Sequence, residues 1–292
     1  MSYDAIVIGS GPNGLSAAVE LARNGAKTLV VEAAETIGGG TRTKELTLPG
    51  YHHDFCSAVH PMGILSPFWK ELPLADYGLE WVTPEASVAH PLEGEPAAIL
   101  TKDVAETAEN LGQDGNAWRR MVKPLLRKPE GLLKDALAPL GFPRHPFLLA
   151  LFGLNGMFPA TTYSKLRFST TRGRAMFAGC AGHSVLPLEK PFSSAVAVIF
   201  ALTAHMENWP VAKGGSYTVT KALANYFKDL GGEIQTNFRV NSLEQLPDAK
   251  VILFDTDPTQ LSNIAADALP DRYRNRLAKY NYGPGGFKVD WA

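Results

Sequence analysis

Residues 3–32 read YDAIVIGSGPNGLSAAVELARNGAKTLVVE, and this stretch decides the fold. The apolar run 5–8 is typical of a strand that is buried on both faces of a parallel sheet. From Leu15 onward, apolar side chains recur at i, i+3, i+4 and i+7, which predicts an amphipathic helix. Gly25 stands where a helix stop is expected, and residues 28–31 read as a second strand. The sequence therefore predicts an α/β protein that begins with a βαβ unit.

Three glycines, Gly9, Gly11 and Gly14, join the first strand to the helix with GxGxxG spacing. The first permits a tight turn, the second lets the backbone approach a pyrophosphate, and the third allows close packing of helix on strand. The helix N-terminus offers unpaired N–H groups to phosphates. Glu32, at the carboxyl end of the second strand, can accept hydrogen bonds from ribose hydroxyls and would repel a 2′-phosphate. Strand, glycine loop, helix, strand and acid, in that order, predict a dinucleotide-binding Rossmann-like domain.

The segment that follows, 32–43 (EAAETIGGGTRT), distinguishes between dinucleotides. It resembles the N-terminal signature of the flavoprotein superfamily that contains phytoene desaturases and flavin amine oxidases. That signature runs from the acidic residue through a short spacer into a Gly-Gly pair and then Ser or Thr. Gly38, Gly39 and Thr43 fall at the matching positions. Glycine there would let the loop pass close to a diphosphate and a ribityl chain, where a Cβ would clash.

The sequence departs from this signature at one point. Many members carry Arg directly after the glycine pair, whereas here Gly40 follows and Arg42 comes two positions later. Arg42 is the candidate to supply the missing positive charge. The resemblance implies FAD as the cofactor. The residues expected to bind it are Gly9, Gly11, Pro12, Asn13, Gly14, Glu32, Ala33, Gly39, Gly40, Thr41, Arg42 and Val240.

Later segments extend the resemblance over most of the chain. Residues 45–61 (ELTLPGYHHDFCSAVHP) look most like bacterial phytoene dehydrogenase-related oxidoreductases. Residues 212–240 read as a glycine pair, a helix, a second glycine pair and a strand; the superfamily holds adenine through the backbone of a valine just beyond that strand, and Val240 matches it. Residues 251–258 (VILFDTDP) resemble the strand and turn that return the chain to the nucleotide domain.

These segments imply an interleaved architecture. An FAD/NAD(P)-binding Rossmann-like domain of the glutathione-reductase type is expected from residues 1–70 and 195–268. An α+β substrate or cap domain, incomplete, is expected from 71–194 and 269–292. Superfamily members are considerably longer and end in a second flavin-contacting segment, which has no match here. The sequence therefore predicts a truncated chain, or one whose flavin site is completed by a partner chain.

The expected function is that of an FAD-dependent, phytoene dehydrogenase-like oxidoreductase. It would act by hydride transfer on a small hydrophobic substrate bound between the domains. No catalytic side chain is assigned, because a flavin can accept a hydride without an essential protein base. Two alternatives stay open: a flavin amine oxidase-like enzyme, and a truncated, non-catalytic FAD-binding partner protein.

The composition of the chain argues against several classes of protein. With 28 basic and 29 acidic residues, the chain lacks the basic excess typical of nucleic-acid binding. Cys56 and Cys180 lie far apart and outside any CxxC pair, so a disulfide framework or thiolate zinc site is not predicted, and a cytoplasmic location is expected. The first residues lack a basic region followed by a long apolar run, and are interpreted as a mature start and not a signal peptide.

One apolar stretch, 146–158 (PFLLALFGLNGMF), is too short to span a bilayer. It is expected to form a buried or cap-domain helix; a wall of a lipophilic substrate pocket and a shallow peripheral membrane contact are the alternatives. A basic cluster is expected to be a solvated helix face, with anionic lipid or a partner as the alternative contact. This cluster comprises Arg119, Arg120, Lys123, Arg127 and Lys128.

Histidines are candidates for metal ligands and for proton-transfer groups. A metal-like cluster comprises His52, His53, Asp54, Cys56 and His60. Adjacent histidines point to opposite sides of an extended chain, so structural or pocket-lining roles are favoured and no metal is predicted. His183 and His205 are expected to be helix residues that are hydrogen-bonded in or near the core.

Overall fold

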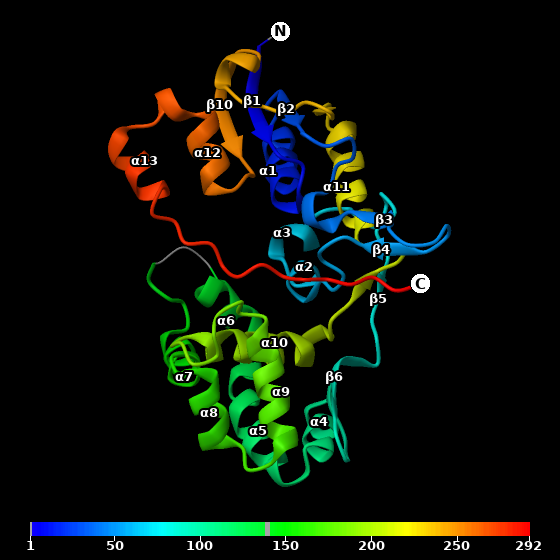
Figure 1. Ribbon diagram of the computed structural model, residues 1–292, viewed down its shortest axis with the longest axis vertical. Helices are drawn as coiled ribbons and strands as arrows, with labels where there is room; N and C mark the ends of the chain where they lie inside the picture. The colour runs from blue at the N-terminus through cyan, green and yellow to red at the C-terminus, as the bar shows by residue number, and fades with distance from the viewer. Residues whose placement is uncertain (1, 138–140) are drawn as a thin grey trace.

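The computed structural model describes residues 2–137 and 141–292, which form two bodies (Figure 1). Residues 1 and 138–140, which fall within the two expected domains, lie outside the described residues. The upper body, here the sheet domain, contains β1 Tyr3–Ile8, α1 Pro12–Arg23, β2 Thr28–Val31, β3 Thr43–Glu45, β4 His52–Asp54, α3 Pro67–Lys70, α11 Tyr217–Asp229, β9 Glu233–Gln235, β10 Ala249–Phe254, α12 Pro258–Ile264 and α13 Asp271–Leu277. The lower body, here the helical domain, contains β6 Ala86–Leu92, β7 Glu95–Thr101, α4 Val104–Asn110, α5 Gly115–Val122, α6 Pro129–Leu137, α7 Pro146–Gly156, α8 Ala160–Arg167, α9 Thr171–Gly182 and α10 Ser193–Glu207.

Short elements connect or border the two domains. The helix α2 Pro61–Ile64 contacts α10, and the two-residue strands β5 Trp81–Val82 and β8 Val211–Ala212 pair where the chain leaves and re-enters the sheet domain. β3 pairs antiparallel with β4, and β6 with β7. Single 3-10 turns occur at Gly39–Thr41, Gly112–Asp114, Leu125–Arg127, Leu243–Gln245 and Ala266–Ala268.

The central sheet is parallel and has the strand order β10-β1-β2-β9. Successive side chains of β1 point to opposite faces, as a strand requires. Val7 packs with α1 and α11 on one face, whereas Ile6 and Ile8 pack with Val240 on the other. Both faces are therefore covered, which explains the continuous apolar run of the sequence. The predicted α/β architecture with a Rossmann-like domain is confirmed.

The helices on the α1 face follow the predicted periodicity. The four apolar positions of the predicted face of α1 (15, 18, 19 and 22) are all buried. The helix ends just before Gly25, whose φ of +80° is the left-handed conformation that favours glycine. On α11, Val219, Leu223 and Phe227 are fully buried against the same core. Close packing of α1 and α11 fixes the glycine loop at the end of β1.

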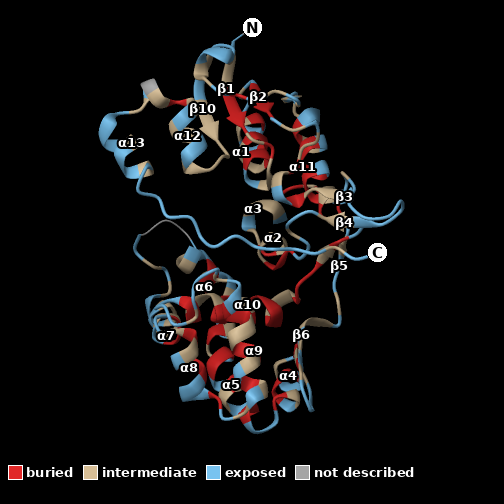
Figure 2. Cartoon of the chain, in the orientation of Figure 1, coloured by how far each residue is buried: buried red, intermediate tan, exposed pale blue. Residues whose placement is uncertain are grey.

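The helical domain has its own core. Much of α5, α9 and α10 is buried (Figure 2). Trp118, Phe177 and Leu202, on these three helices respectively, are fully buried. The apolar stretch at 146–158 does form a helix of this domain, α7, and its Leu148 and Phe152 pack on the core. It is thus a helix of the domain expected to be the cap, and its opposite face is exposed: Phe147 is 91% exposed.

Two observations differ from the expected domain boundaries. The sequence places the return to the nucleotide domain at residue 195, but α10 joins the helical core, and the chain returns only at β8, where Ala212 enters the core shared by α1 and α11. The sequence assigns residues 269–292 to the cap domain, but α13 packs beside α12 in the sheet domain. From there an extended segment crosses between the domains (Figure 1), and Tyr282 Oη donates to Asp257 at 2.7 Å.

No helix in the described part of the chain combines the length and apolar character that crossing a bilayer requires.

Candidate functional site

A pocket of about 470 Å³ lies at the carboxyl ends of β1, β2 and β10, where the sheet meets the N-terminus of α1. This is the edge at which parallel sheets bind ligands. Predicted cofactor residues that line it are Gly9, Gly11, Pro12, Asn13, Glu32, Ala33, Gly39, Gly40, Arg42 and Val240. Lining residues that the sequence did not predict include Ser10, Ala34, Phe238, Arg239, Asp255, Thr256 and Gln260.

The glycine loop has no room for side chains. Gly9 has a φ of +108°, and a Cβ on Gly14 would lie 2.4 Å from the carbonyl oxygen of Gly9. Gly14 therefore does not line the pocket but lets α1 approach β1, as predicted. A Cβ on Gly11 would lie 2.8 Å from Asp255 Oδ2. The open backbone of the loop is thus maintained by close contacts with β1 and with the end of β10.

Asp255 is a site residue that the sequence reasoning missed. It follows β10, the neighbour of β1, and its Oδ2 accepts a hydrogen bond from the backbone N–H of Gly14 at 2.9 Å. The carboxylate thus caps the first turn of α1 from a different strand. The sequence does contain a pattern that points to this residue. Asp255 is the first polar residue after the apolar run 251–254, and neighbouring parallel strands end at the same edge of a sheet.

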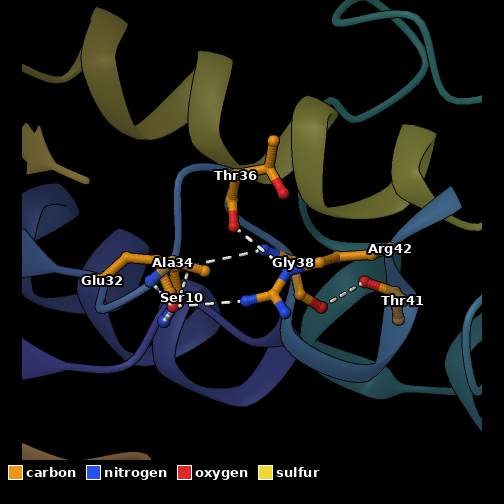
Figure 3. A network of polar contacts seen from close by, with 7 residues as sticks. All are labelled: Ser10, Glu32, Ala34, Thr36, Gly38, Thr41 and Arg42. Atoms are coloured by element: carbon orange, nitrogen blue, oxygen red, sulfur yellow. Dashed lines mark hydrogen bonds and ion pairs between the residues drawn. The ribbon is translucent and has the colours of Figure 1, made fainter. Parts of the chain in front are cut away.

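Glu32 forms the centre of a polar network beside the loop (Figure 3). It is buried, and its Oε2 accepts from both the N–H (3.1 Å) and the Oγ (2.5 Å) of Ser10. Its Oε1 accepts from the N–H of Ala34 at 2.8 Å and from Arg42 Nη2 at 3.3 Å. The ribose-binding candidate is therefore held rigidly in the pocket wall.

Arg42 lies at the predicted site but makes an unexpected contact. Besides its ion pair with Glu32, its Nε donates to the carbonyl oxygen of Thr36 at 3.1 Å (Figure 3). Its side chain is 20% exposed and lines the pocket. The guanidinium thus links two points of the 32–42 loop: its Nε donates to the backbone carbonyl of Thr36 and its Nη2 to the carboxylate of Glu32.

The second glycine pair shapes the opposite wall. Gly38 and Gly39 have φ values of +118° and +53°, and a Cβ on Gly39 would lie 3.1 Å from the Cα of Gly11. The two glycine loops therefore touch. Thr41, expected to bind the cofactor, is instead buried behind the loop: its Oγ1 donates to the carbonyl oxygen of Gly38 at 2.7 Å, and it does not line the pocket.

An unpaired polar group marks the pocket as a site for a polar ligand. The Oγ1 of Thr256 is buried and has no hydrogen-bond partner among the described residues, although buried hydroxyls normally have one. Together with the cradle of glycines, the helix N-terminus and Glu32, it fits the adenosine diphosphate portion of a dinucleotide. The residues present therefore suit the predicted ligand.

The histidines are not grouped around this pocket. In residues 2–137 and 141–292, no three His, Cys, Asp or Glu side chains are arranged to hold a metal ion. His60 is buried, its Nε2 2.9 Å from Ser216 Oγ, and burial lowers its pKa despite the opposing charge of Asp54. His205 is buried beside Trp118, whose Nε1 donates to it at 2.9 Å. Both His60 and His205 therefore have hydrogen-bond partners inside the protein and serve the packing of the fold.

The basic cluster is spread over a solvated surface. Arg120, Lys123, Arg127 and Lys128 are exposed and Arg119 is partly exposed, all on or just after α5. This agrees with the interpretation as a solvated face.

A second pocket, of about 710 Å³, lies where α2 and α3 meet α6. Its walls are largely apolar, with Met62, Leu65, Leu133 and Phe142 among them. Two of the acids at its edge are already paired: Glu130 with Lys70 at 3.3 Å, and Asp135 with the N–H of His145 at 2.7 Å. The pocket thus combines apolar walls with charged side chains, among which Glu71, Lys134 and Arg144 also line it.

Comparison with known proteins identifies relatives of part of the chain. Residues 7–72 match the family described as "NAD(P)-binding Rossmann-like domain". The rat "Pyridine nucleotide-disulfide oxidoreductase domain-containing protein 2" is 33% identical over 165 residues, which are 50% of this chain and 27% of that protein. One component of the limonene dehydrogenase of Castellaniella defragrans is 32% identical over 108 residues, 37% of this chain and 19% of that protein. The matches thus span about a quarter or less of these relatives.

Solved structures resemble almost the whole chain. An oxidoreductase from Methanosarcina mazei has a TM-score of 0.63 at 18% identity, covering 96% of this chain and 65% of that one. Cyclohexylamine oxidase from Brevibacterium oxydans IH-35A has a TM-score of 0.57 at 18% identity, covering 94% and 63%. At such identities the likeness establishes the fold. This chain spans just under two thirds of those chains.

Proposed function

We propose that the pocket at the sheet edge binds FAD, and that the chain acts in an FAD-dependent oxidoreductase of the phytoene dehydrogenase-like type. The observation that carries the proposal is the contact between the two glycine loops, with Glu32 beside them. A single glycine loop suits any dinucleotide. The second loop lines the pocket through Gly39 and Gly40, and this wall without side chains would let a diphosphate and a flavin chain pass close to the backbone.

Each part of the pocket has a role in this proposal. The N-terminus of α1 and the loop N–H groups hold the diphosphate. Glu32 accepts from the adenosine ribose, and the backbone of Val240 holds the adenine. The bound flavin would supply the hydride chemistry. The residues of this chain would bind and orient the cofactor, and Gly9, Gly11 and Gly39 leave space for it because they have no side chains.

An apolar substrate is favoured over an amine. Apolar side chains line the pocket between α2, α3 and α6 together with charged ones, and two of its three acidic side chains, Glu130 and Asp135, already have partners. Lys70 Nζ lies 3.3 Å from Oε1 of Glu130, which places a positive charge beside this acid that would repel an ammonium ion. The limonene dehydrogenase relative, which by its name acts on an apolar molecule, supports the same class. The amine oxidase alternative has a fold likeness in its favour, and Glu71 is the acid at this pocket that an amine could use.

The test is a direct titration of the purified chain. FAD, NAD⁺ and NADP⁺ are added separately and followed by calorimetry, and the FAD complex is checked by its visible spectrum before and after dithionite. FAD is expected to bind most tightly and NADP⁺ least, because Glu32 repels a 2′-phosphate. Failure to bind FAD after reconstitution, or a preference for NAD⁺, would overturn the proposal.

A matched pair of variants checks the assignment of the ribose. Glu32→Gln should weaken FAD binding about 10- to 100-fold, because a charge-assisted hydrogen bond is lost. Glu130→Gln, an equivalent change in the other pocket, should leave the affinity unchanged. Turnover is then assayed with a cyclic terpene and with cyclohexylamine. Oxidation of the amine alone would favour the amine oxidase alternative, and tight FAD binding without turnover of either would favour the non-catalytic one.

A further inference from the structure

The acceptor capacity of Glu32 is fully used within the protein. A carboxylate has about four lone-pair sites on its two oxygens. Two are taken on Oε2 by Ser10, and two on Oε1 by Ala34 and Arg42. A ribose hydroxyl that donates to Glu32, as the proposed function requires, must therefore displace one of these donors.

Arg42 is the donor most easily displaced. The N–H groups of Ser10 and Ala34 belong to the backbone, and the carbonyl oxygen of Ser10 accepts from Gly38 at 3.0 Å. The Ser10 hydroxyl makes the shortest of the four contacts, at 2.5 Å, and itself accepts from the N–H of Gly38 at 3.3 Å. The contact from Arg42 Nη2 to Glu32 is the longest of the four, at 3.3 Å. It comes from the end of a flexible side chain that lines the pocket.

A diphosphate offers Arg42 a better partner. The planar guanidinium matches phosphate oxygens with two parallel donors. Arg42 and the phosphate-binding glycine loop line the same pocket, and Gly39, three residues before Arg42, touches Gly11. The guanidinium can therefore leave Glu32 without losing a charged partner only if the incoming ligand carries phosphate.

We infer that Arg42 is a specificity-determining residue that competes with ribose for Glu32 and makes the pocket selective for phosphate-bearing adenosine compounds over adenosine itself. The inference rests on the proposed function, since it assumes a ribose at Glu32. It explains the departure of this sequence from the family signature. Two positions beyond the usual arginine, the guanidinium lies against the ribose-binding acid.

The experiment compares adenosine, ADP and FAD binding to the wild-type chain and to Arg42→Met by calorimetry. Met keeps an unbranched stem but has neither charge nor donor. The variant should bind adenosine about 2- to 5-fold more tightly, because an ion pair of this exposure competes weakly. It should bind ADP and FAD about 10-fold or more weakly, because a charged phosphate contact is lost. Opposite shifts for adenosine and ADP are the signature.

Two further variants keep the test decisive. Arg239→Met removes a second arginine from the same pocket, one with no ion pair among the described residues, and should not tighten adenosine binding. Arg42→Lys keeps the charge and should recover part of the ADP affinity; it also serves if Arg42→Met does not fold. Equal weakening of adenosine and ADP in both Arg42 variants would overturn the inference and assign Arg42 a purely structural role. Absence of FAD binding in the wild type would instead overturn the proposed function.

Discussion

The sheet domain and the helical domain use their buried polar groups in opposite ways. In the sheet domain, the polar side chains of Glu32, Arg42 and Asp255 line an open pocket. The loops beside them contain glycines with positive φ, a backbone conformation that other residues rarely adopt. In the helical domain, a buried carboxylate has internal partners instead. Asp114 accepts from the N–H and hydroxyl groups of Ser169 and Thr170, next to the first turn of α9.

Because of this difference, we expect substitutions in the two domains to act differently on ligand affinity and on the free energy of unfolding. Polar groups that face a pocket can exchange a protein partner for a ligand, whereas groups whose partners are all internal can only hold the fold. Changes in the helical core should therefore lower the free energy of unfolding without altering the affinity for ADP. Changes at the glycine loop should alter both. For substitutions in the helical core and in the glycine loop, the free energy of unfolding is measured in urea and the affinity by ADP titration.

The largest effect is expected from Trp118→Ala. Trp118 is fully buried, and its Nε1 donates to His205. The centroids of its ring and that of Phe168 are 6.3 Å apart. Its removal should cost about 3–5 kcal/mol of unfolding free energy through the cavity left behind. Trp291→Ala, at a position that is 83% exposed, is the matched control and should cost less than about 0.5 kcal/mol. A folded Trp118→Ala that has lost ADP affinity would break the comparison.

The next effect belongs to the glycine loop. Gly14→Ala places a Cβ 2.4 Å from the carbonyl oxygen of Gly9, so the helix must move away from the strand. We expect a loss of about 2–3 kcal/mol in unfolding free energy and weaker ADP binding. Gly153→Ala on α7 is the control: nothing lies within 4 Å of the added Cβ, and the change should be neutral or stabilising by about 0.5–1 kcal/mol. Wild-type ADP affinity in Gly14→Ala would contradict the assignment of the loop.

Acid should weaken the helical domain through His205. Burial lowers its pKa below the ordinary value, although hydrogen bonds to the backbone of Lys102 and Thr101 oppose this. The unfolded chain therefore takes up a proton first, and stability is expected to fall as the pH drops below about 6.5, by about 1.4 kcal/mol for each pKa unit that separates the two states. Burial also lowers the pKa values of His60, His90 and His183, which add to the slope.

The variant His205→Gln isolates this contribution. Glutamine can still accept from Trp118 Nε1 but does not titrate. The variant should lose part of the pH dependence between about pH 7.5 and 5.5, measured as urea midpoints at each pH. An unchanged slope would mean that the other histidines carry the effect.

The sequence made the sheet domain predictable because local pattern and final environment agree there. The strand, the glycine loop and the helix each have a separate signal in residues 5–23, and parallel strands bring their carboxyl ends together. Asp255 could have been found by the same rule. The network around Glu32 could not, because it depends on where the side chains of Ser10 and Arg42 turn within the loop.

The helical domain was less predictable for a physical reason. α7 and α10 are apolar on nearly every side, so their sequences lack the periodicity that tells a buried face from an exposed one. Most of α10 falls in the range 195–268 that was expected in the nucleotide domain, but the helix packs on α9 and α7. Uniformly apolar helices are placed by the packing of the whole domain, and the local sequence does not encode that.

The smallest effect tests the exposed face of α7. Phe147 is 91% exposed, and serine has a helix propensity close to that of phenylalanine, so Phe147→Ser should change the unfolding free energy by less than about 0.5 kcal/mol. Phe152→Ser, on the same helix but packed against the core, should cost about 2 kcal/mol. Unfolding is measured at two protein concentrations. A cost above about 1 kcal/mol for Phe147→Ser that grows with concentration would mean that this face is covered by a second copy in solution. The helical domain would then, like the sheet domain, present a binding surface, and the contrast between the two domains would no longer hold.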